Sequence, residues 1–179
     1  GGHDYAIDLV KQIKDMNSGI YLDDEMKDAS PTDFCMGIAG YPEKHFEAPN
    51  LYSDMKWFKA KVDAGADYIV TQMFFDNKKY FEFVDLCRKN DITVPIIPGL
   101  KILSSRSQLI ALPKIFHIDL PQDLFVELEK CKDDKTVKEI GIKWCIEQSK
   151  ELKKANVPCL HYYTMGTSDS TKRVAKEVF

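Results

Sequence analysis

The chain has 179 residues, of which 44% are hydrophobic and 30% are charged, and its formal net charge is −3. This composition is typical of one globular domain, and the weak negative charge gives no electrostatic basis for binding nucleic acid. No apolar run reaches the length of a membrane span, and the N-terminus carries no signal-peptide pattern. We therefore expect a cytoplasmic protein that binds neither membranes nor nucleic acid.

The cysteines and the N-terminus add two further expectations. There are five cysteines, an odd number without CxxC spacing, and several fall at expected core positions of strands or helices. We therefore predict buried thiols, with neither a disulfide nor a metal site. The chain does not begin with Met and opens on a possible helix cap, Asp4, so we expect it to be a fragment.

The first third of the chain predicts a helix, a loop and a short strand. Apolar residues at helical spacing follow Asp4 and predict a helix that ends near residues 17–19. The polar segment 20–33 contains a proline and is predicted to be a loop within the domain. Residues 34–39 predict a strand closed by a Gly-Tyr-Pro turn. The irregular segment 43–53 after it is a site candidate, because long loops often carry function.

The most informative stretch is the next strand, predicted over residues 68–75. A helix that begins at Ser53 or Asp54 and stops at Gly65 leads into it. The strand is apolar almost throughout, which is typical of a parallel strand buried on both faces. Asp76 is placed to cap the helix that follows.

Gln72 is the polar exception within this strand. A side-chain amide there must find partners for up to four hydrogen bonds or point at a ligand. One interpretation is a core glutamine bonded to neighbouring backbone. The other is a ligand contact, because parallel α/β folds place their sites at the C-terminal ends of strands.

The rest of the chain continues the alternation of helices and strands. The predicted elements are a helix from Asp76 to Asn90, a strand over 93–97 closed by Pro98-Gly99, a helix over 105–112 broken by Pro113, a helix opening at Pro121, a long helix with a Thr136–Glu139 capping box that runs to about residue 155, a strand over 158–163 and a helix over 170–179. With no hairpin signal and no GxGxxG or Walker motif, this order predicts a parallel α/β fold other than a Rossmann sheet. Four βα units are half of an eight-stranded barrel of about 250 residues.

Several motifs, in one order and at consistent spacing over nearly the whole chain, resemble methylenetetrahydrofolate reductase of the bacterial type. They are Tyr5–Val10, Ala39–His45, Glu47-Ala48, Asp54–Lys61, Val62–Asp67, Thr71–Asp76, Pro95–Gly99 and Leu160–Thr164. The resemblance implies a flavin-binding (βα)8 TIM barrel. This chain would supply about its last four βα units as a single domain over residues 1–179, with the N-terminal strands absent.

In that family FAD takes a hydride from NADH or NADPH and passes it to 5,10-methylenetetrahydrofolate, which gives 5-methyltetrahydrofolate for one-carbon metabolism and methionine supply. We also expect a homo-oligomer, because four βα units leave two parallel strand edges unpaired. The positions that match FAD contacts are Tyr5, Ala6, Tyr41, His45, Ala48, Asp54 and Lys61. Gln72 and Gln108 match positions that contact folate. The choice between NADH and NADPH stays open.

The family's general acid, a glutamate near the end of the first barrel strand, would precede Gly1. No catalytic residue is therefore expected in this chain, and the fragment alone is expected to be inactive. The alternative is a half-barrel that acts only as a flavin-binding, folate-binding or structural module. Thr167 stands where the family often has an arginine, which leaves a cationic contact to the folate tail open.

Elementary chemistry agrees with part of this assignment. The FAD phosphates need cationic or N–H donors, which His45, Lys61 and a helix starting near Asp54 can supply. Without the resemblance, Lys61 would be taken for a surface lysine.

Overall fold

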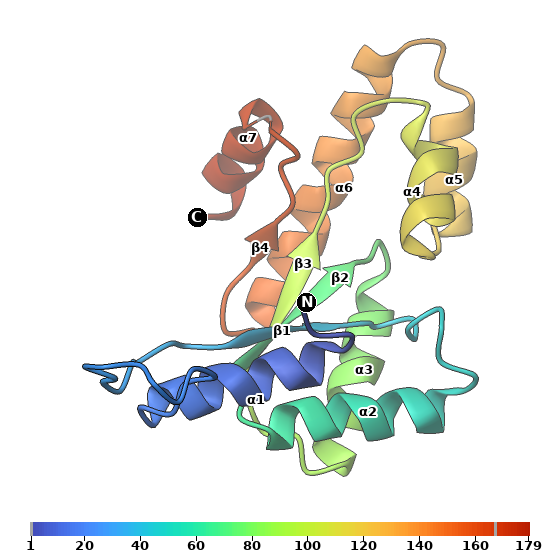
Figure 1. Cartoon of the computed structure of the whole chain (residues 1–179). Coiled ribbons are helices and arrows are strands. Elements are labelled where there is room, and N and C mark those ends of the chain that lie inside the picture. The colour runs from blue at the N-terminus through green and yellow to red at the C-terminus, as the bar shows by residue number, and fades with distance from the viewer. Residues whose placement is uncertain (1, 167) are drawn as a thin grey trace.

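A computed structural model describes residues 2–166 and 168–179 and shows four parallel strands alternating with helices. The strands lie side by side in their chain order (Figure 1). The elements are α1 (Ala6–Asn17), β1 (Gly37–Gly40), α2 (Leu51–Asp63), β2 (Tyr68–Met73), α3 (Asn77–Lys89), β3 (Ile96–Leu100), α4 (Gln108–Phe116), α5 (Gln122–Glu129), α6 (Asp134–Lys154), β4 (His161–Tyr162) and α7 (Asp169–Val178). The predicted parallel α/β class is confirmed, and the arrangement is consistent with a partial (βα) barrel.

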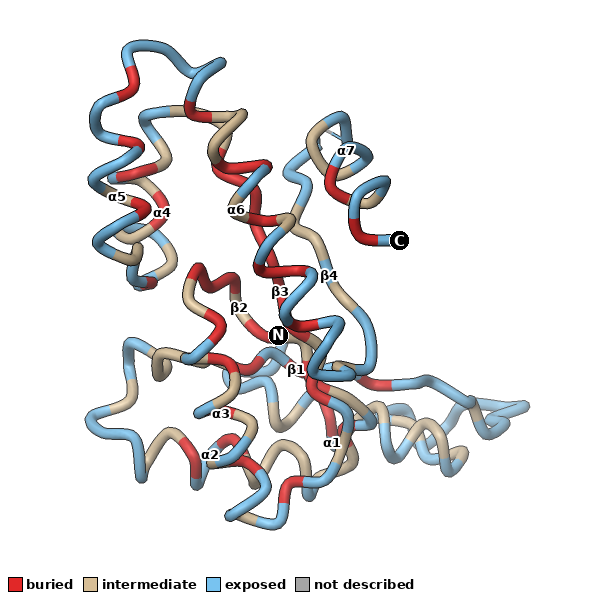
Figure 2. The backbone as a smooth tube through the Cα atoms, turned by 180° about the vertical axis from the view of Figure 1, so that it is seen from behind, coloured by how far each residue is buried: buried red, intermediate tan, exposed pale blue. Residues whose placement is uncertain are grey.

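The core of the molecule lies between the sheet and the helices that cover one of its faces. Ile69, Ile96 and Leu100 are at most 1% exposed and pack with helix side chains in the larger core cluster. Figure 2 shows the buried positions along β2, β3 and parts of α6. A second cluster, which includes Leu124 and Leu128, joins α4, α5 and α6. Each such buried side chain stabilises the fold by about 1.5–3 kcal/mol relative to an exposed one.

Side chains of a strand alternate between the two faces of the sheet. In β2, Ile69, Thr71 and Met73 are buried, whereas Tyr68 and Gln72 are half-buried on the opposite face. The strand is therefore not buried evenly on both faces, although its apolar sequence predicted that. The face that carries Tyr68 and Gln72 corresponds to the interior face of a closed (βα)8 barrel, because the helices of such a barrel cover the opposite face. We call it the interior face.

The third strand runs through the Pro98-Gly99 pair that was predicted to end it. β3 tolerates the proline because its register against β2 shifts there, and the Gly99 N–H donates to Oγ1 of Thr71 at 2.9 Å. A side chain at Gly99 would meet the Thr71 carbonyl oxygen at 2.2 Å. The Tyr163 hydroxyl donates to that oxygen at 2.9 Å. Gly99 is therefore required by close backbone approach.

Two of the predicted helix caps are wrong and one is confirmed. Tyr5, not Asp4, occupies the N-cap of α1 and makes no side-chain cap bond. Oδ1 of Asp133 caps α6, accepting from the Thr136 N–H at 2.8 Å, so the predicted capping box from Thr136 does not form. Oδ1 of Asp76 caps α3 by accepting from the Lys78 N–H at 2.9 Å, as predicted.

Several predicted boundaries also shift. β1 begins at Gly37 and not at residue 34, and β4 is limited to two residues of the segment predicted as 158–163. Pro113 lies inside α4 and does not end it. The missing proline N–H weakens this helix. Its buried Leu109 and Leu112 offset that loss through packing.

Cysteine burial follows the prediction in part. Cys87, Cys131 and Cys145 are buried and Cys35 and Cys159 are exposed, all as free thiols. Burial raises the pKa of Cys87 and of Cys145 to about 12, so both stay protonated at neutral pH. None of the helices in the described part of the chain has the length and apolar character needed to cross a bilayer. Thr167 lies outside the described residues.

Candidate functional site

A cavity of about 500 Å³ lies between α1, β1 and the loop that follows β1. Its wall is apolar along α1 and carries polar groups near the end of the strand. The lining residues are Ala6, Leu9, Val10, Ile13, Phe34, Cys35, Met36, Gly37, Ile38, Ala39, Tyr41, His45 and Lys61. Four of the seven residues predicted to hold FAD, namely Ala6, Tyr41, His45 and Lys61, thus line one cavity.

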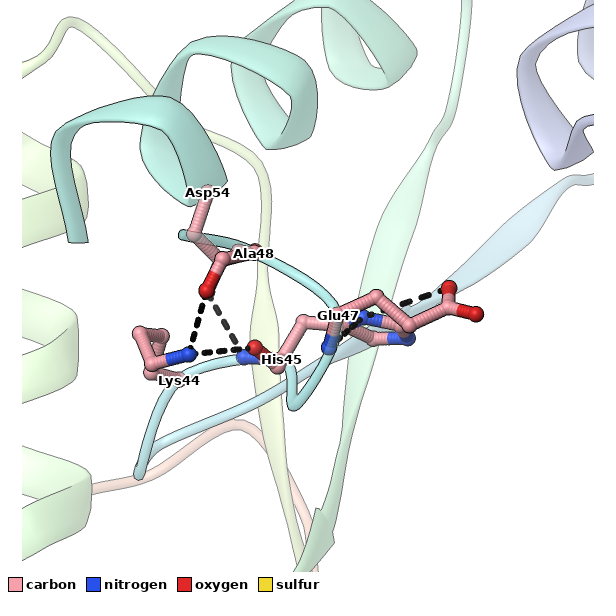
Figure 3. Close-up of polar contacts among 5 residues, drawn as sticks. All are labelled: Lys44, His45, Glu47, Ala48 and Asp54. Atoms are coloured by element: carbon pink, nitrogen blue, oxygen red, sulfur yellow. Dashed lines mark hydrogen bonds and ion pairs between the residues drawn. The ribbon is translucent and has the colours of Figure 1, made fainter. Parts of the chain in front are cut away.

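Asp54 and Ala48, two others of the predicted set, shape the loop that carries His45. Oδ2 of Asp54 accepts from the His45 N–H at 2.9 Å (Figure 3). The Lys44 ammonium donates to the carbonyl oxygens of His45 at 2.9 Å and of Ala48 at 2.6 Å. Neither Asp54 nor Ala48 lines the cavity. Asp54 therefore holds the loop from the first turns of α2, and Ala48 holds it from within the loop.

The start of α2 differs from the prediction, and this moves the helix N-terminus. The helix begins at Leu51, and Oδ1 of Asn50 caps it by accepting from the Ser53 N–H at 2.9 Å. Lys61 lies in its last turn, about 15 Å further along the helix axis. One phosphate group cannot contact both places. The joint contact of Lys61 and the helix N-terminus with the two FAD phosphates therefore stays a prediction, whereas His45 and Lys61 do share the cavity.

The His45 ring is held among other rings. Its centroid lies 4.5 Å from that of Tyr41 in an edge-to-face arrangement and 5.1 Å from that of Phe46. Phe46 in turn stacks on His117 at 4.4 Å, which links the loop to the end of α4. Nδ1 of His45 accepts from the Glu47 N–H at 3.3 Å. When the ring is neutral, this bond places its proton on Nε2, which makes no hydrogen bond among the described residues and can donate to an anion.

Lys61 is a half-buried cation on the cavity wall. Burial lowers its pKa, and the carboxylate of Asp54 opposes this shift. Its Nζ lies 5.5 Å from the centroid of the Phe58 ring, and no carboxylate of the described residues forms an ion pair with it. Burial also raises the pKa of Tyr41, with smaller contributions from Asp54 and Glu47. A neutral phenol and a partly desolvated ammonium therefore face the same cavity, where an anion would be stabilised.

The remaining predicted residues lie elsewhere. Tyr5 is 72% exposed at the start of α1, next to Ala6 but off the cavity wall. Gln108 begins α4, and its Oε1 accepts from the Ser104 N–H at 2.8 Å. Gln72 is half-buried on the interior face of the sheet. Neither glutamine is among the residues that line the cavity.

Gln72 combines the two interpretations that its sequence position left open. Its Oε1 accepts from the Met73 N–H at 2.9 Å, which is the bond to neighbouring backbone expected of a core residue. In the described part of the chain its Nε2 makes no hydrogen bond. The side chain therefore presents amide N–H donors on the interior face of the sheet.

Two residues that shape the loop escaped prediction from the sequence. Asn50 is a strong capping type, but it stands three residues ahead of the expected helix start, in a segment whose sequence predicts a loop. Lys44 adopts a φ of 78° and bonds to carbonyl groups of its own loop. A lysine carries no sequence signal for that role, so only the folded loop identifies it.

Known proteins resemble this chain in sequence and in fold. The family model described as methylenetetrahydrofolate reductase matches residues 1–178. The chain belongs to the methylenetetrahydrofolate reductase family. It is 33% identical over 178 residues to methylenetetrahydrofolate reductase 1 of Schizosaccharomyces pombe, covering 99% of this chain and 27% of that protein. It is 32% identical over 173 residues to the 5,10-methylenetetrahydrofolate reductase of Buchnera aphidicola subsp. Baizongia pistaciae. That match covers 96% of this chain and 54% of the Buchnera protein.

A third family relative is the probable methylenetetrahydrofolate reductase (NADPH) of Caenorhabditis elegans, which is 36% identical to this chain. The match covers 81% of this chain and 22% of the Caenorhabditis elegans protein. The chain thus spans about half of the bacterial relative and about a quarter of the eukaryotic ones. A solved protein from Clostridium thermocellum, described as binding two copies of 5-methyl-5,6,7,8-tetrahydrofolic acid, has a TM-score of 0.58 and 17% identity, covering 82% of this chain and 53% of its own. That likeness shows the fold alone.

Proposed function

We propose that this chain is part of a flavin-dependent reductase that converts 5,10-methylenetetrahydrofolate to 5-methyltetrahydrofolate with NADH or NADPH as the electron donor. Family membership supports the reaction class. The observation that carries the proposal is the cavity of about 500 Å³ that brings Ala6, Tyr41, His45 and Lys61 together. These four residues come from α1, the loop after β1 and α2, and they match positions that hold FAD in the family.

The chemistry of the cavity suits part of an FAD molecule. A volume of about 500 Å³ lies within the usual range for small-molecule sites. The apolar α1 wall suits a ring or a sugar edge, and the half-buried Lys61 with the Nε2–H of His45 suits a phosphate. We propose that Asp54 and Ala48 keep the loop in the shape that presents His45. When bound, the flavin would supply the hydride chemistry.

For the folate substrate, we propose that Gln72 donates its Nε2 hydrogens to acceptor atoms on the edge of the pterin ring, since its Oε1 is already engaged. Gln108 is the second proposed folate contact. Its Oε1 is held by Ser104, which leaves its amino group to donate as well. Protonation that opens the folate ring needs a positioned acid. We assign that role to no residue of this chain and propose that it comes from the N-terminal strands of the family's barrel.

The test is Gln72→Ala in the complete reductase that contains this segment, with each half-reaction followed by flavin absorbance. Oxidation of reduced flavin by methylenetetrahydrofolate should slow by at least tenfold, because the variant lacks a donor to the pterin. Reduction by NADH or NADPH should change little, since the nicotinamide lacks the pterin edge. The control is Gln122→Ala, at an exposed position of α5. Equal losses in both half-reactions would show that Gln72 serves the fold, and a complete protein without either half-reaction would refute the reductase assignment.

A further inference from the structure

A second cavity lies on the side of the sheet covered by helices, between the start of α3, the start of α5 and the middle of α6. Its volume is about 460 Å³. The lining residues are Phe75, Asp76, Asn77, Pro121, Asp123, Trp144, Glu147, Gln148 and Glu151. None of them lines the cavity proposed for FAD. We call this second cavity the acidic groove.

The acidic groove has four carboxylates and no basic residue in its lining. Oδ1 of Asp76 caps α3, and Oε2 of Glu151 accepts from Nδ2 of Asn77 at 2.6 Å. Glu147 lies 3.6 Å from the exposed ammonium of Lys150. Within the described residues Asp123 has neither a hydrogen-bonding side-chain partner nor an ion pair. Lys150 therefore balances part of the negative charge of the groove, and the other carboxylates face no cation among the lining residues.

An independent observation comes from Gln148 at the base of the groove, which is 6% exposed. Its Nε2 donates to the Phe74 carbonyl oxygen at 3.4 Å and to Oδ1 of Asn77 at 3.2 Å. Its Oε1 is buried and, within the described residues, accepts no hydrogen bond. Exchanging the two ends of the amide would place Oε1 against the Phe74 carbonyl oxygen, so the network fixes the orientation. Gln148 thus presents a buried acceptor that calls for a donor.

The apolar part of the lining is rigid. Nε1 of Trp144 donates to the Phe75 carbonyl oxygen at 2.9 Å, which holds the indole ring in place. Phe75 and Pro121 add further apolar surface beside it. Aromatic faces attract organic cations and also pack against methylene groups. A bare metal ion would use the carboxylates but not this apolar surface.

We propose that the acidic groove binds a linear aliphatic polyamine. Its ammonium groups would pair with Asp123, Glu147 and Glu151, and one N–H would donate to Oε1 of Gln148. Its methylene segments would lie against Trp144. Carboxylates interspersed with aromatic surface suit a ligand that alternates charge with hydrocarbon, and the volume is that of a small-molecule site. The proposal does not depend on the reductase assignment.

The test is calorimetric titration of the 179-residue chain with spermine at fixed ionic strength. The double variant Asp123→Asn, Glu147→Gln removes two exposed charges and should weaken binding by at least about tenfold. Gln148→Met removes the buried acceptor and should also weaken it. The control is Glu139→Gln, which lies on α6 outside the groove and pairs with Arg173. Circular dichroism verifies that each variant is folded.

Three outcomes would contradict the polyamine proposal. Spermine affinity that is unchanged in the double variant, or lowered equally by Glu139→Gln, would overturn the proposal, because it would indicate diffuse surface attraction. Displacement of spermine by Mg²⁺ at matched charge concentration would overturn it in favour of a metal site. If the double variant no longer self-associates, the groove binds a basic side chain of a second copy of the chain, and the polyamine proposal is wrong.

Discussion

Lys61 shows how burial changes the chemistry of a residue type that is ordinarily exposed. It lies on the cavity wall with part of its hydration removed, which lowers its pKa. In the ligand-free chain the folded state therefore binds the lysine proton less tightly than the unfolded state does. This penalty on folding is fully present below the lowered pKa and disappears as the pH rises above the ordinary value of 10.5. A bound phosphate would reverse the shift, because it favours the charged form.

We predict that Lys61→Met weakens FAD binding by about tenfold or more, since a charge-assisted hydrogen bond contributes roughly 1.5–3 kcal/mol. Wild-type affinity should fall as the pH rises through the lowered pKa of Lys61, and the variant should lack this dependence. Flavin fluorescence titration over alkaline pH measures both effects. The matched control is Lys59→Met, whose lysine pairs with Asp63 at 3.0 Å. Tight, pH-independent binding by the Lys61 variant would remove Lys61 from the site.

At the scale of elements, α2 and the loop before it form one unit. Asn50 ends the loop and caps the helix, and four residues later Asp54 accepts from the His45 N–H. The helix start therefore determines where the His45 ring lies. Lys44 closes the loop from the other side by bonding to two of its carbonyl groups. This explains how a polar, irregular segment can hold a defined shape.

We predict that Asn50→Ala lowers the free energy of unfolding by about 1 kcal/mol, because one N–H of the first helical turn loses its acceptor. For a domain of this size the melting temperature should fall by about 2–4 °C. FAD affinity should fall as well, since the loop loses one anchor. Asn50→Asp keeps an acceptor oxygen and should retain both properties. A melting temperature for Asn50→Ala equal to that of wild type would contradict the role of the cap.

At the scale of the whole molecule, the sheet is open. β1 and β4 each pair with one neighbouring strand in the described residues, so each leaves one edge without a strand partner there. The face that carries Tyr68 and Gln72 is less buried than the helix-covered face. We propose that the other strands of the family's barrel cover this face and these edges. Exposed edges of parallel strands otherwise promote pairing with another chain.

We predict that the 179-residue chain self-associates at micromolar concentration, as measured by size-exclusion chromatography with light scattering. Ala39→Asp places a charge at an exposed position of the edge strand β1 and should reduce association. Ala155→Asp, at an exposed position after α6, should not. A monodisperse monomer over the same range would show that the open edges are protected within this chain.

The sequence by itself determined the order of helices and strands, the parallel class, the Asp76 cap and membership of the family. These features depend on local signals: apolar periodicity, capping residue types and short motifs. The same signals selected Ala6, Tyr41, His45 and Lys61 through resemblance, and the folded chain brings these four together. Gln72 was marked as unusual because an amide is rare in so apolar a strand.

The tertiary structure decided between alternatives that local sequence signals do not distinguish. Asp133 and Thr136 are both good caps, and in the folded chain α6 begins at Asp134 with Asp133 as its cap. Pro113 was accepted inside α4 because buried leucines offset its lost hydrogen bond, and Pro98-Gly99 continued β3 because Thr71 supplied an acceptor from the neighbouring strand. The acidic groove combines Asn77, Asp123 and Trp144 from three helices, and the neighbouring members of this set lie 46 and 21 positions apart along the chain. Contacts between residues so far apart in sequence leave no periodic pattern, and for that reason only the folded chain reveals them.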